Sequence, residues 1–143
     1  FLSQPKEGVV MFLELDMASE KPIYIQLKEQ LIEGMARGNL KPGDDLPSVR
    51  SLASDIGINM HTVNKVFQQL KQEGYIQTHR KRGVIIHPDG FPPADKEYLN
   101  QLNDELRPLI AASICRGLTK EEFLEMSEDI YRDILKKEGD HHG

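Results

Sequence analysis

The sequence has one cysteine, Cys115, in 143 residues. A single cysteine excludes an internal disulfide and a cysteine-rich zinc site. No apolar run approaches the roughly 18 residues of a membrane-spanning helix. The apolar stretch at residues 9–15 is too short for a signal peptide and is interrupted by Glu14. These absences argue against a secreted or membrane protein, so we expect a cytoplasmic protein with no membrane partner.

Patterns typical of enzymes and metal sites are also scarce. The sequence has no glycine-rich phosphate loop and no nucleophile elbow. Cys115 falls in an apolar helical pattern, where a buried, inert thiol is expected rather than a nucleophile. Of the five histidines, those at 61, 79 and 87 are far apart, and His141 and His142 lie in a polar tail. We therefore expect no enzyme activity, no cofactor and no metal site.

Charge is unevenly distributed along the chain, whose formal net charge is −5. Residues 9–90 contain ten basic and ten acidic residues, whereas residues 91–143 contain seven basic and twelve acidic residues. Within residues 60–87 five basic residues accompany a single acidic residue, Glu73. Local charge, rather than the total, governs the approach to a phosphate backbone. The overall acidity therefore does not exclude nucleic acid as a partner.

A short strand at residues 9–16 and two helical patterns are expected in the first part of the chain. Pro22 opens the first helix, because proline is favoured in the first turn, and Gly38 ends it. Ser48 is a suitable N-cap for the second helix, which stops at Gly57. A third helix follows at once, so the two helices hinged at Gly57 have the layout of a helix-turn-helix.

The third helix, expected from about residue 60 or 61 to residue 73, separates apolar from polar residues. The apolar positions follow the i, i+3, i+4, i+7 spacing of a buried stripe: Val63, Val66, Phe67 and Leu70. The polar residues on the other side are His61, Asn64, Lys65, Gln68 and Gln72. Asparagine and glutamine can bond adenine in a bidentate manner, and lysine can reach guanine or phosphate. A solvated face is the alternative, but the neighbouring elements favour DNA contact.

A basic hairpin is expected after this helix, with strands at residues 75–78 and 84–86 and a tip at residues 79–83. A hairpin that follows a recognition helix is a wing. The adjacent cations Arg80, Lys81 and Arg82 repel one another to an extent set by ionic screening. A nearby phosphate strand would relieve this repulsion, so we expect phosphate or minor-groove contact. A solvated hairpin tip is the alternative.

Arg50, at the start of the second helix, is a further candidate. In helix-turn-helix proteins this helix crosses the DNA backbone, so we expect Arg50 to contact a phosphate. The alternative is a surface arginine paired with Asp45 or Asp55.

Residues 88–93 contain three prolines and a glycine and form the clearest boundary in the chain. Two helices are expected after it; Pro108 should kink the first, and Thr119 and Glu122 form a capping box at the start of the second. A lone helix pair buries too little for a core, so we expect its apolar stripes to pair with a second copy. Docking onto the N-terminal domain is the alternative. The expected dimerisation residues are Leu99, Leu102, Leu106, Leu109, Ile110, Phe123, Ile130 and Ile134.

A series of motif residues runs in order through residues 22–86. They are Pro22-Ile23-Tyr24, Gln26-Leu27, Gly38, Leu40, Pro42-Gly43, Leu46-Pro47-Ser48, Arg50, Leu52-Ala53, Gly57, Thr62-Val63, Leu70, Glu73-Gly74 and Ile76. With these residues the chain resembles the GntR family of transcription regulators, and in its short form the YtrA-like branch. The resemblance implies a winged helix-turn-helix and a dimer that binds a pseudo-palindromic operator, usually as a repressor. It also implies that Ser48, Arg50, Thr62 and the wing near Gly83 approach DNA.

Two positions depart from the family pattern. Met60 stands where many members carry arginine, so Asn59, His61 or Asn64 would have to take over that contact. Lys81 replaces the first glycine of the usual Gly-x-Gly wing, which should make the wing stiffer and more basic. The residues after position 93 are too few for the larger effector domains or for a domain that binds pyridoxal phosphate. A small-molecule effector would have to bind at the dimer interface or between domains.

The sequence therefore predicts an α+β, mainly helical protein with a winged helix-turn-helix domain followed by a small two-helix dimerisation domain. The expected segments are an N-terminal extension at 1–10, the DNA-binding domain at 11–88, a linker at 89–93, the dimerisation domain at 94–139 and a polar tail at 140–143. The extension and the tail are either native or added to the natural chain. The expected DNA-binding residues are Ser48, Arg50, Asn59, His61, Thr62, Asn64, Lys65, Gln68, Arg80, Lys81, Arg82 and Gly83.

The expected function is that of a homodimeric, sequence-specific regulator of double-stranded DNA. By its resemblance it is a repressor of its own or a transport-related operon. The alternative is a winged-helix adaptor that binds proteins and does not read DNA.

Overall fold

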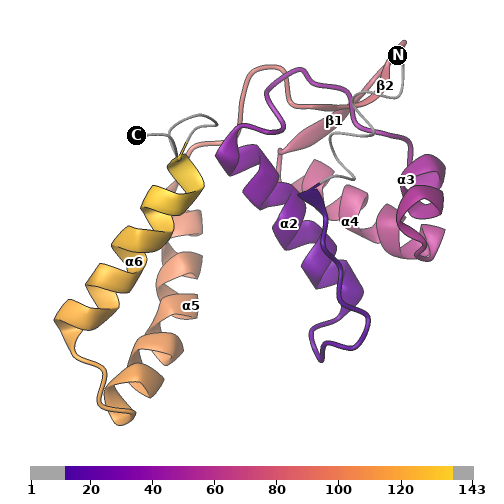
Figure 1. Ribbon diagram of the computed structural model, residues 1–143. Coiled ribbons are helices and arrows are strands. Elements are labelled where there is room, and N and C mark those ends of the chain that lie inside the picture. The colour runs from indigo at the N-terminus through magenta and orange to yellow at the C-terminus, as the bar shows by residue number, and fades with distance from the viewer. Residues whose placement is uncertain (1–11, 137–143) are drawn as a thin grey trace. The chain divides into compact units, whose positions relative to one another are not determined.

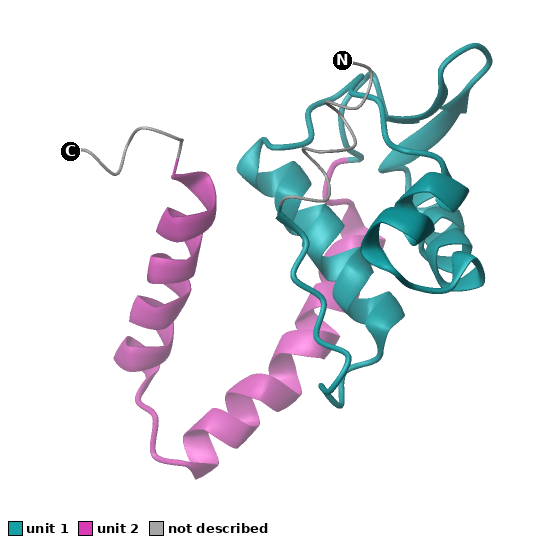
Figure 2. Cartoon of the chain, turned by 45° about the vertical axis from the view of Figure 1, so that its right-hand side comes forward, with its two compact units in different colours: residues 1–92 teal, residues 93–143 magenta. Residues whose placement is uncertain are grey.

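The computed structural model describes residues 12–136, and the expected extension and polar tail lie outside the described residues. The chain divides into two compact units, residues 1–92 and 93–143 (Figure 2). The first unit contains α2 (Ile23–Arg37), α3 (Val49–Ile56), α4 (Met60–Gln72), β1 (Ile76–His79) and β2 (Gly83–Ile86). The second contains α5 (Lys96–Cys115) and α6 (Lys120–Leu135) (Figure 1).

The core of the first unit lies between α2, α3 and α4, because α4 packs against both other helices. The expected apolar stripe of α4 is confirmed, since its four side chains are at most 1% exposed. They meet Leu27 and Leu31 of α2 and Leu52 of α3 in one cluster. This packing leaves the opposite face of α4 to the solvent.

The helix ends agree closely with the sequence signals. Ser48 caps α3 through a hydrogen bond from the Ser51 backbone N–H to its hydroxyl oxygen (3.0 Å), and Gly57 ends the helix in a left-handed conformation (φ 72°). Gly38 ends α2 in the same way. Pro22 is the N-cap of α2, one residue before the first turn in which it was expected.

The expected strand at residues 9–16 is wrong for its described part, because residues 12–16 contain no strand. Two glutamines of α2 bind this segment instead. The Gln30 side-chain amide exchanges two hydrogen bonds with the Glu14 backbone (2.7 and 3.0 Å), and Gln26 does the same with Asp16 (2.8 and 3.0 Å). A side-chain amide has the same donor and acceptor groups as a peptide, so it satisfies the backbone in place of a neighbouring strand.

The wing is an antiparallel hairpin with Ile76 opposite Ile86. Both strands begin one residue away from their expected starts, at Ile76 and Gly83. Residues 43–46 lie along the other edge of β2: the Leu46 N–H donates to Val84 O (2.9 Å), and the Ile86 N–H donates to Asp44 O (2.8 Å). This pairing ties the wing to the turn that precedes α3.

Residues 91 and 92, which follow β2, pack on the first unit. The Phe91 ring lies 5.8 Å from the Tyr75 ring, measured between centroids. Pro92 lies so close to Gly74 that an added Cβ would be 3.2 Å from it, and the φ of Gly74 is positive. Residues 91 and 92, expected in a linker, therefore make contacts within the first unit.

The second unit is a hairpin of two long helices without a buried residue. Asp95 caps α5, and the expected Thr119–Glu122 capping box of α6 is confirmed by both of its hydrogen bonds. Pro108 lies inside α5, which continues through it as one helix. The expectation that Cys115 is buried is wrong for this chain, because Cys115 is exposed. None of the described helices combines the length and apolarity that crossing a membrane demands.

Candidate nucleic-acid interface

The polar face of α4 is exposed as the sequence predicts. Asn59 is the N-cap, and its side-chain oxygen accepts a hydrogen bond from the His61 backbone N–H (2.7 Å). The side chains of His61, Asn64 and Gln68 are exposed, and Thr62 is half-buried. Their donors and acceptors are therefore accessible to a base edge, whereas the carboxamide oxygen of Asn59 already serves the helix end.

Met60, where many family members carry arginine, lies at the start of this helix and is 42% exposed. The departure therefore falls on the accessible end of α4 and not in the core. A thioether offers only a weak acceptor to DNA, so this position can contribute apolar contact but no charge.

Lys65 has a partner that the sequence pattern does not reveal. Its ammonium lies 3.7 Å from the centroid of the Tyr24 ring in the first turn of α2. A cation over an aromatic face is attracted by the ring quadrupole. Tyr24 therefore orients Lys65 at the side of α4. The sequence did not predict this role for Tyr24, because only the folded chain brings positions 24 and 65 together.

Arg50 is exposed in the first turn of α3. Of its two alternative partners, Asp45 is occupied, because its carboxylate forms an ion pair with Arg82 (2.7 Å). No ion pair within residues 12–136 joins Arg50 to Asp55. The Arg50 guanidinium is thus accessible to an external anion beside the capped end of α3.

The wing tip is a tight turn closed by a histidine. The Nδ1 atom of His79 accepts hydrogen bonds from the backbone N–H groups of Lys81 (3.2 Å) and Arg82 (3.3 Å). Gly83 follows with φ 87°, a left-handed conformation that side chains disfavour. Arg80 and Lys81 are exposed at this tip.

The candidate residues lie on three elements of the first unit. Figures 1 and 2 show the hairpin and α3 on the same side of this unit. The first unit thus exposes hydrogen-bonding side chains on α4 and cations on α3 and at the hairpin tip. DNA recognition combines groups of these two kinds, since cations contact phosphates and hydrogen-bonding side chains contact base edges.

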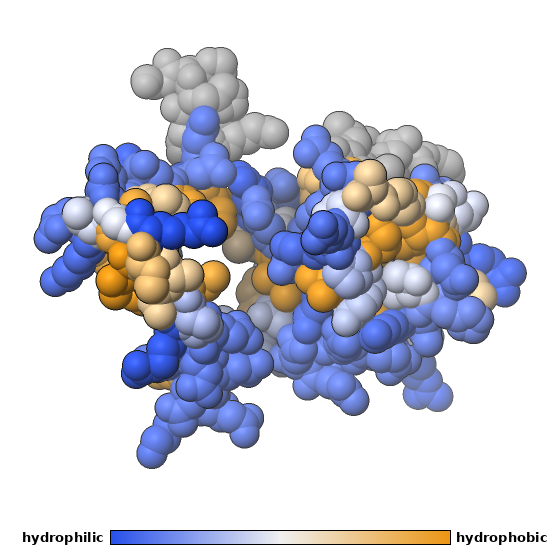
Figure 3. All heavy atoms as spheres, turned by 90° about the horizontal axis from the view of Figure 1, so that it is seen from below, coloured by the Kyte–Doolittle hydropathy of each residue, from blue (hydrophilic) through white to orange (hydrophobic). Residues whose placement is uncertain are grey.

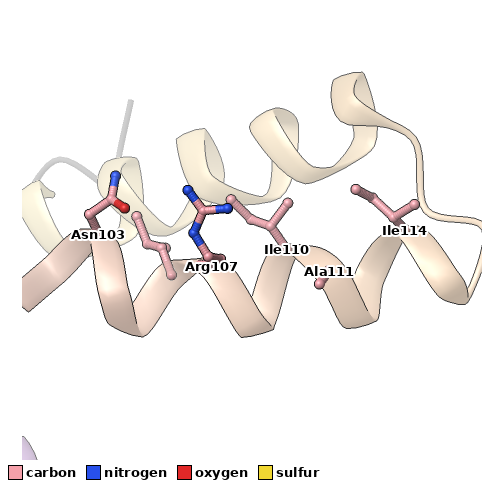
Figure 4. Close-up of a pocket in the computed structure, with 6 residues that line it drawn as sticks. Asn103, Arg107, Ile110, Ala111 and Ile114 are labelled. Atoms are coloured by element: carbon pink, nitrogen blue, oxygen red, sulfur yellow. The ribbon is translucent and has the colours of Figure 1, made fainter.

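Each unit has an open cavity at its surface. One, of about 340 Å³, lies on α5 and is lined by Asn103, Leu106, Arg107, Ile110, Ala111 and Ile114 (Figure 4). The other, of about 230 Å³, lies where the Phe12 segment meets α2. No group of residues described here has the composition and spacing to hold a metal ion.

The hairpin, the helix-turn-helix and the exposed α4 face define the class of protein, which is that of the winged helix-turn-helix proteins. Residues 23–86 match the family model described as "Bacterial regulatory proteins, gntR family". The chain is 34% identical over 122 residues to the HTH-type transcriptional repressor YtrA of Bacillus subtilis, covering 85% of this chain and 94% of that protein. It belongs to the GntR family and is a DNA-binding transcription regulator, not an enzyme.

Solved structures agree with this assignment. A transcriptional antiterminator from Listeria monocytogenes superposes with a TM-score of 0.78 at 27% identity, covering 85% of this chain and 91% of that one. YtrA from Sulfolobus acidocaldarius, a GntR-family transcription factor, has a TM-score of 0.56 at 39% identity, covering 70% of this chain and 98% of that one. Both similarities extend beyond the matched residues 23–86, and the second supports a YtrA-like regulator.

Proposed function

We propose that this chain is a homodimeric repressor that binds a pseudo-palindromic operator. The observation that carries the proposal is the exposed polar face of α4, together with the exposed Arg50 on α3 and the exposed cations of the hairpin tip. The recognition helix would read the major groove, while Arg50 and the tip contact the flanking phosphates. The similarity to a repressor, YtrA, supports the direction of regulation.

The apolar surface of the second unit supports the dimer. Large apolar side chains lie exposed along both helices: Tyr98, Leu99, Leu102, Leu106, Leu109, Ile110, Ile114, Leu124, Met126, Ile130, Tyr131 and Leu135. Figure 3 shows apolar side chains at the surface of this unit, on the left of the view. Monomers rarely expose a contiguous apolar patch above a few hundred Å². Among the expected dimerisation residues, Phe123 and Ile134 are half-buried in the single chain, so the other six would carry most of the contact.

A two-fold dimer would place two recognition helices in successive major grooves. The matching operator has half-sites about 34–36 Å apart, which is one helical turn. The test is a titration of fluorescent duplexes whose half-site spacing changes by half turns. We expect tight binding at one-turn spacing and loss at a half turn. A monomer at micromolar concentration that binds no duplex from its own upstream region would refute the proposal.

A nuclease footprint identifies the regulated genes. A repressor of its own operon, or of a transport-related operon, protects a palindrome upstream of those genes from nuclease. We expect protection over two half-sites upstream of the chain's own gene. As a regulator of transcription, the protein would act in the cytoplasm. A salt-insensitive protein partner, together with no protected DNA, would instead support an adaptor.

A further inference from the structure

The three adjacent cations of the wing tip differ in their contacts. The Arg82 side chain donates from Nε to Asp45 Oδ1 (2.8 Å) and from Nη2 to the Gly43 carbonyl oxygen (2.6 Å). Within residues 12–136 no ion pair involves Arg80 or Lys81. Arg82 therefore has partners within the chain, whereas Arg80 and Lys81 are accessible to an external anion, although the three cations are adjacent in the sequence.

The two contacts of Arg82 lie on the segment that already pairs with β2. The Gly43 N–H donates to Ile86 O (3.0 Å), and Asp45 bridges to Ile85. A guanidinium is a planar fork, so two partners at once fix its orientation as well as its position. Arg82 thus ties the free end of the hairpin to the turn that leads into α3 and Arg50.

We propose that Arg82 and Asp45 are positioning residues that hold the wing in its DNA-binding orientation, and that Arg80 and Lys81 supply the phosphate contacts of the tip. The proposal rests on the proposed DNA-binding function. A loop held in its bound conformation loses less entropy when it binds. If Arg82 turned to a phosphate instead, the carboxylate of Asp45 would be left beside DNA without its cation.

The substitution Asp45→Asn tests the positioning role, because it should weaken DNA binding if Asp45 positions the wing and strengthen it if Asp45 acts only through its charge. Removal of a negative charge near DNA should strengthen binding by Coulomb attraction alone. If the pair positions the wing, Asp45→Asn weakens binding by about two- to five-fold, the range expected for an exposed ion pair. Asp89→Asn is the matched control, since it removes the same charge from an exposed position in the same unit. Equal or tighter binding by Asp45→Asn than by this control would overturn the proposal.

Salt dependence gives a second readout. A phosphate contact contributes about 0.9 to the slope of log K against log salt concentration. We expect Arg80→Gln to lower the slope by about that amount, whereas Arg82→Gln weakens binding with little change of slope. The double variant Asp45→Asn/Arg82→Gln should bind no more weakly than the worse single variant, because both remove one interaction. A slope loss in Arg82→Gln equal to that in Arg80→Gln would show that Arg82 contacts phosphate.

Amide relaxation of residues 80–82 in the free protein tests the positioning without DNA. We expect order parameters near 0.85 in the wild type, falling toward the ~0.6 of flexible backbone in Asp45→Asn and Arg82→Gln but not in Arg80→Gln. Unchanged order parameters would overturn the inference while leaving the DNA-binding function intact. Failure of the wild type to bind any duplex would instead contradict the proposed function.

Discussion

Among residues 12–92, Gln26 is the buried polar residue, with 7% of its surface exposed. Its oxygen accepts from the Asp16 N–H (2.8 Å), and its nitrogen donates to the carbonyls of Asp16 (3.0 Å) and Lys21 (2.8 Å). A buried amide whose donors and acceptor are all paired stabilises the fold. If the amide is removed, the backbone groups that it paired are left without a hydrogen bond, which costs free energy because they remain shielded from water. One side chain thus attaches the chain on both sides of the turn before α2.

We predict that Gln26→Ala lowers the free energy of unfolding by about 1–3 kcal/mol, because three partly buried hydrogen bonds lose their partner. Urea unfolding followed by circular dichroism measures the change. Gln30→Ala is the matched control: it removes two comparable bonds at a more exposed site, where water replaces them, and should cost less than about 1 kcal/mol. Equal losses in the two variants would contradict the role assigned to burial.

Arg50→Ala should weaken binding to every duplex, whatever its sequence, and reduce the salt slope by about one unit. The reason is that a phosphate contact carries charge but no base information. Fluorescence anisotropy at several salt concentrations measures the slope. Arg132→Ala, which removes the same charge from α6, should leave it unchanged. An unaltered slope in Arg50→Ala would remove this residue from the phosphate contacts.

At the scale of the element, α4 joins three functions in one helix. Asn59 caps its start, its apolar stripe supports the core, and its polar face is exposed. Tyr24 reaches it from α2 and holds Lys65 at its flank. The groups that remain most accessible for base edges are those of His61, Asn64 and Gln68.

We predict that Asn64→Ala and His61→Ala each change which bases are preferred in one half-site. A lost bidentate contact reduces discrimination at a single position by about 1–3 kcal/mol. Selection from a randomised duplex library shows the altered position. Lys71→Ala, late in the same helix, is the control and should keep the preference. If all three variants selected the same sequence as the wild type, another element would read the bases.

At the scale of the whole molecule, the two units differ in burial. The first unit has a buried core and accessible polar groups, and the second has helices without a buried residue. In the proposed dimer a second copy would cover this apolar surface with an identical one, because a two-fold interface uses the same patch on both subunits. Affinity for a two-half-site operator then depends on both units.

We predict that Ile110→Glu weakens self-association and, with it, binding to the two-half-site operator. Ile110 is 39% exposed in the single chain, so the charge would cost little in a monomer and much in a buried interface. Sedimentation equilibrium measures the association. Gln101→Glu adds the same charge on the opposite side of α5, at about 100° per residue, and should leave the dimer intact. A dimer unaffected by Ile110→Glu would place the interface elsewhere.

The sequence alone determined the parts that depend on neighbours within one or two turns. Ser48, Gly57 and the Thr119–Glu122 box predicted helix ends, and the apolar spacing of α4 predicted its buried face, because caps and periodicity act over three to seven residues. The family resemblance then identified the winged helix-turn-helix that the comparisons confirm. These signals were enough for the class of protein and for the polar face that the structure exposes.

The tertiary structure alone decided which distant side chains meet. Residues 12–16 bind two glutamines and not a neighbouring strand, and Cys115 stays exposed because the hairpin that carries it has no core. Arg82 meets Asp45 across 37 positions, and Lys65 meets Tyr24 across the α2–α4 contact. Such pairs leave no periodic trace in the sequence, because their spacing is set by how the helices pack and not by the backbone repeat of any one element.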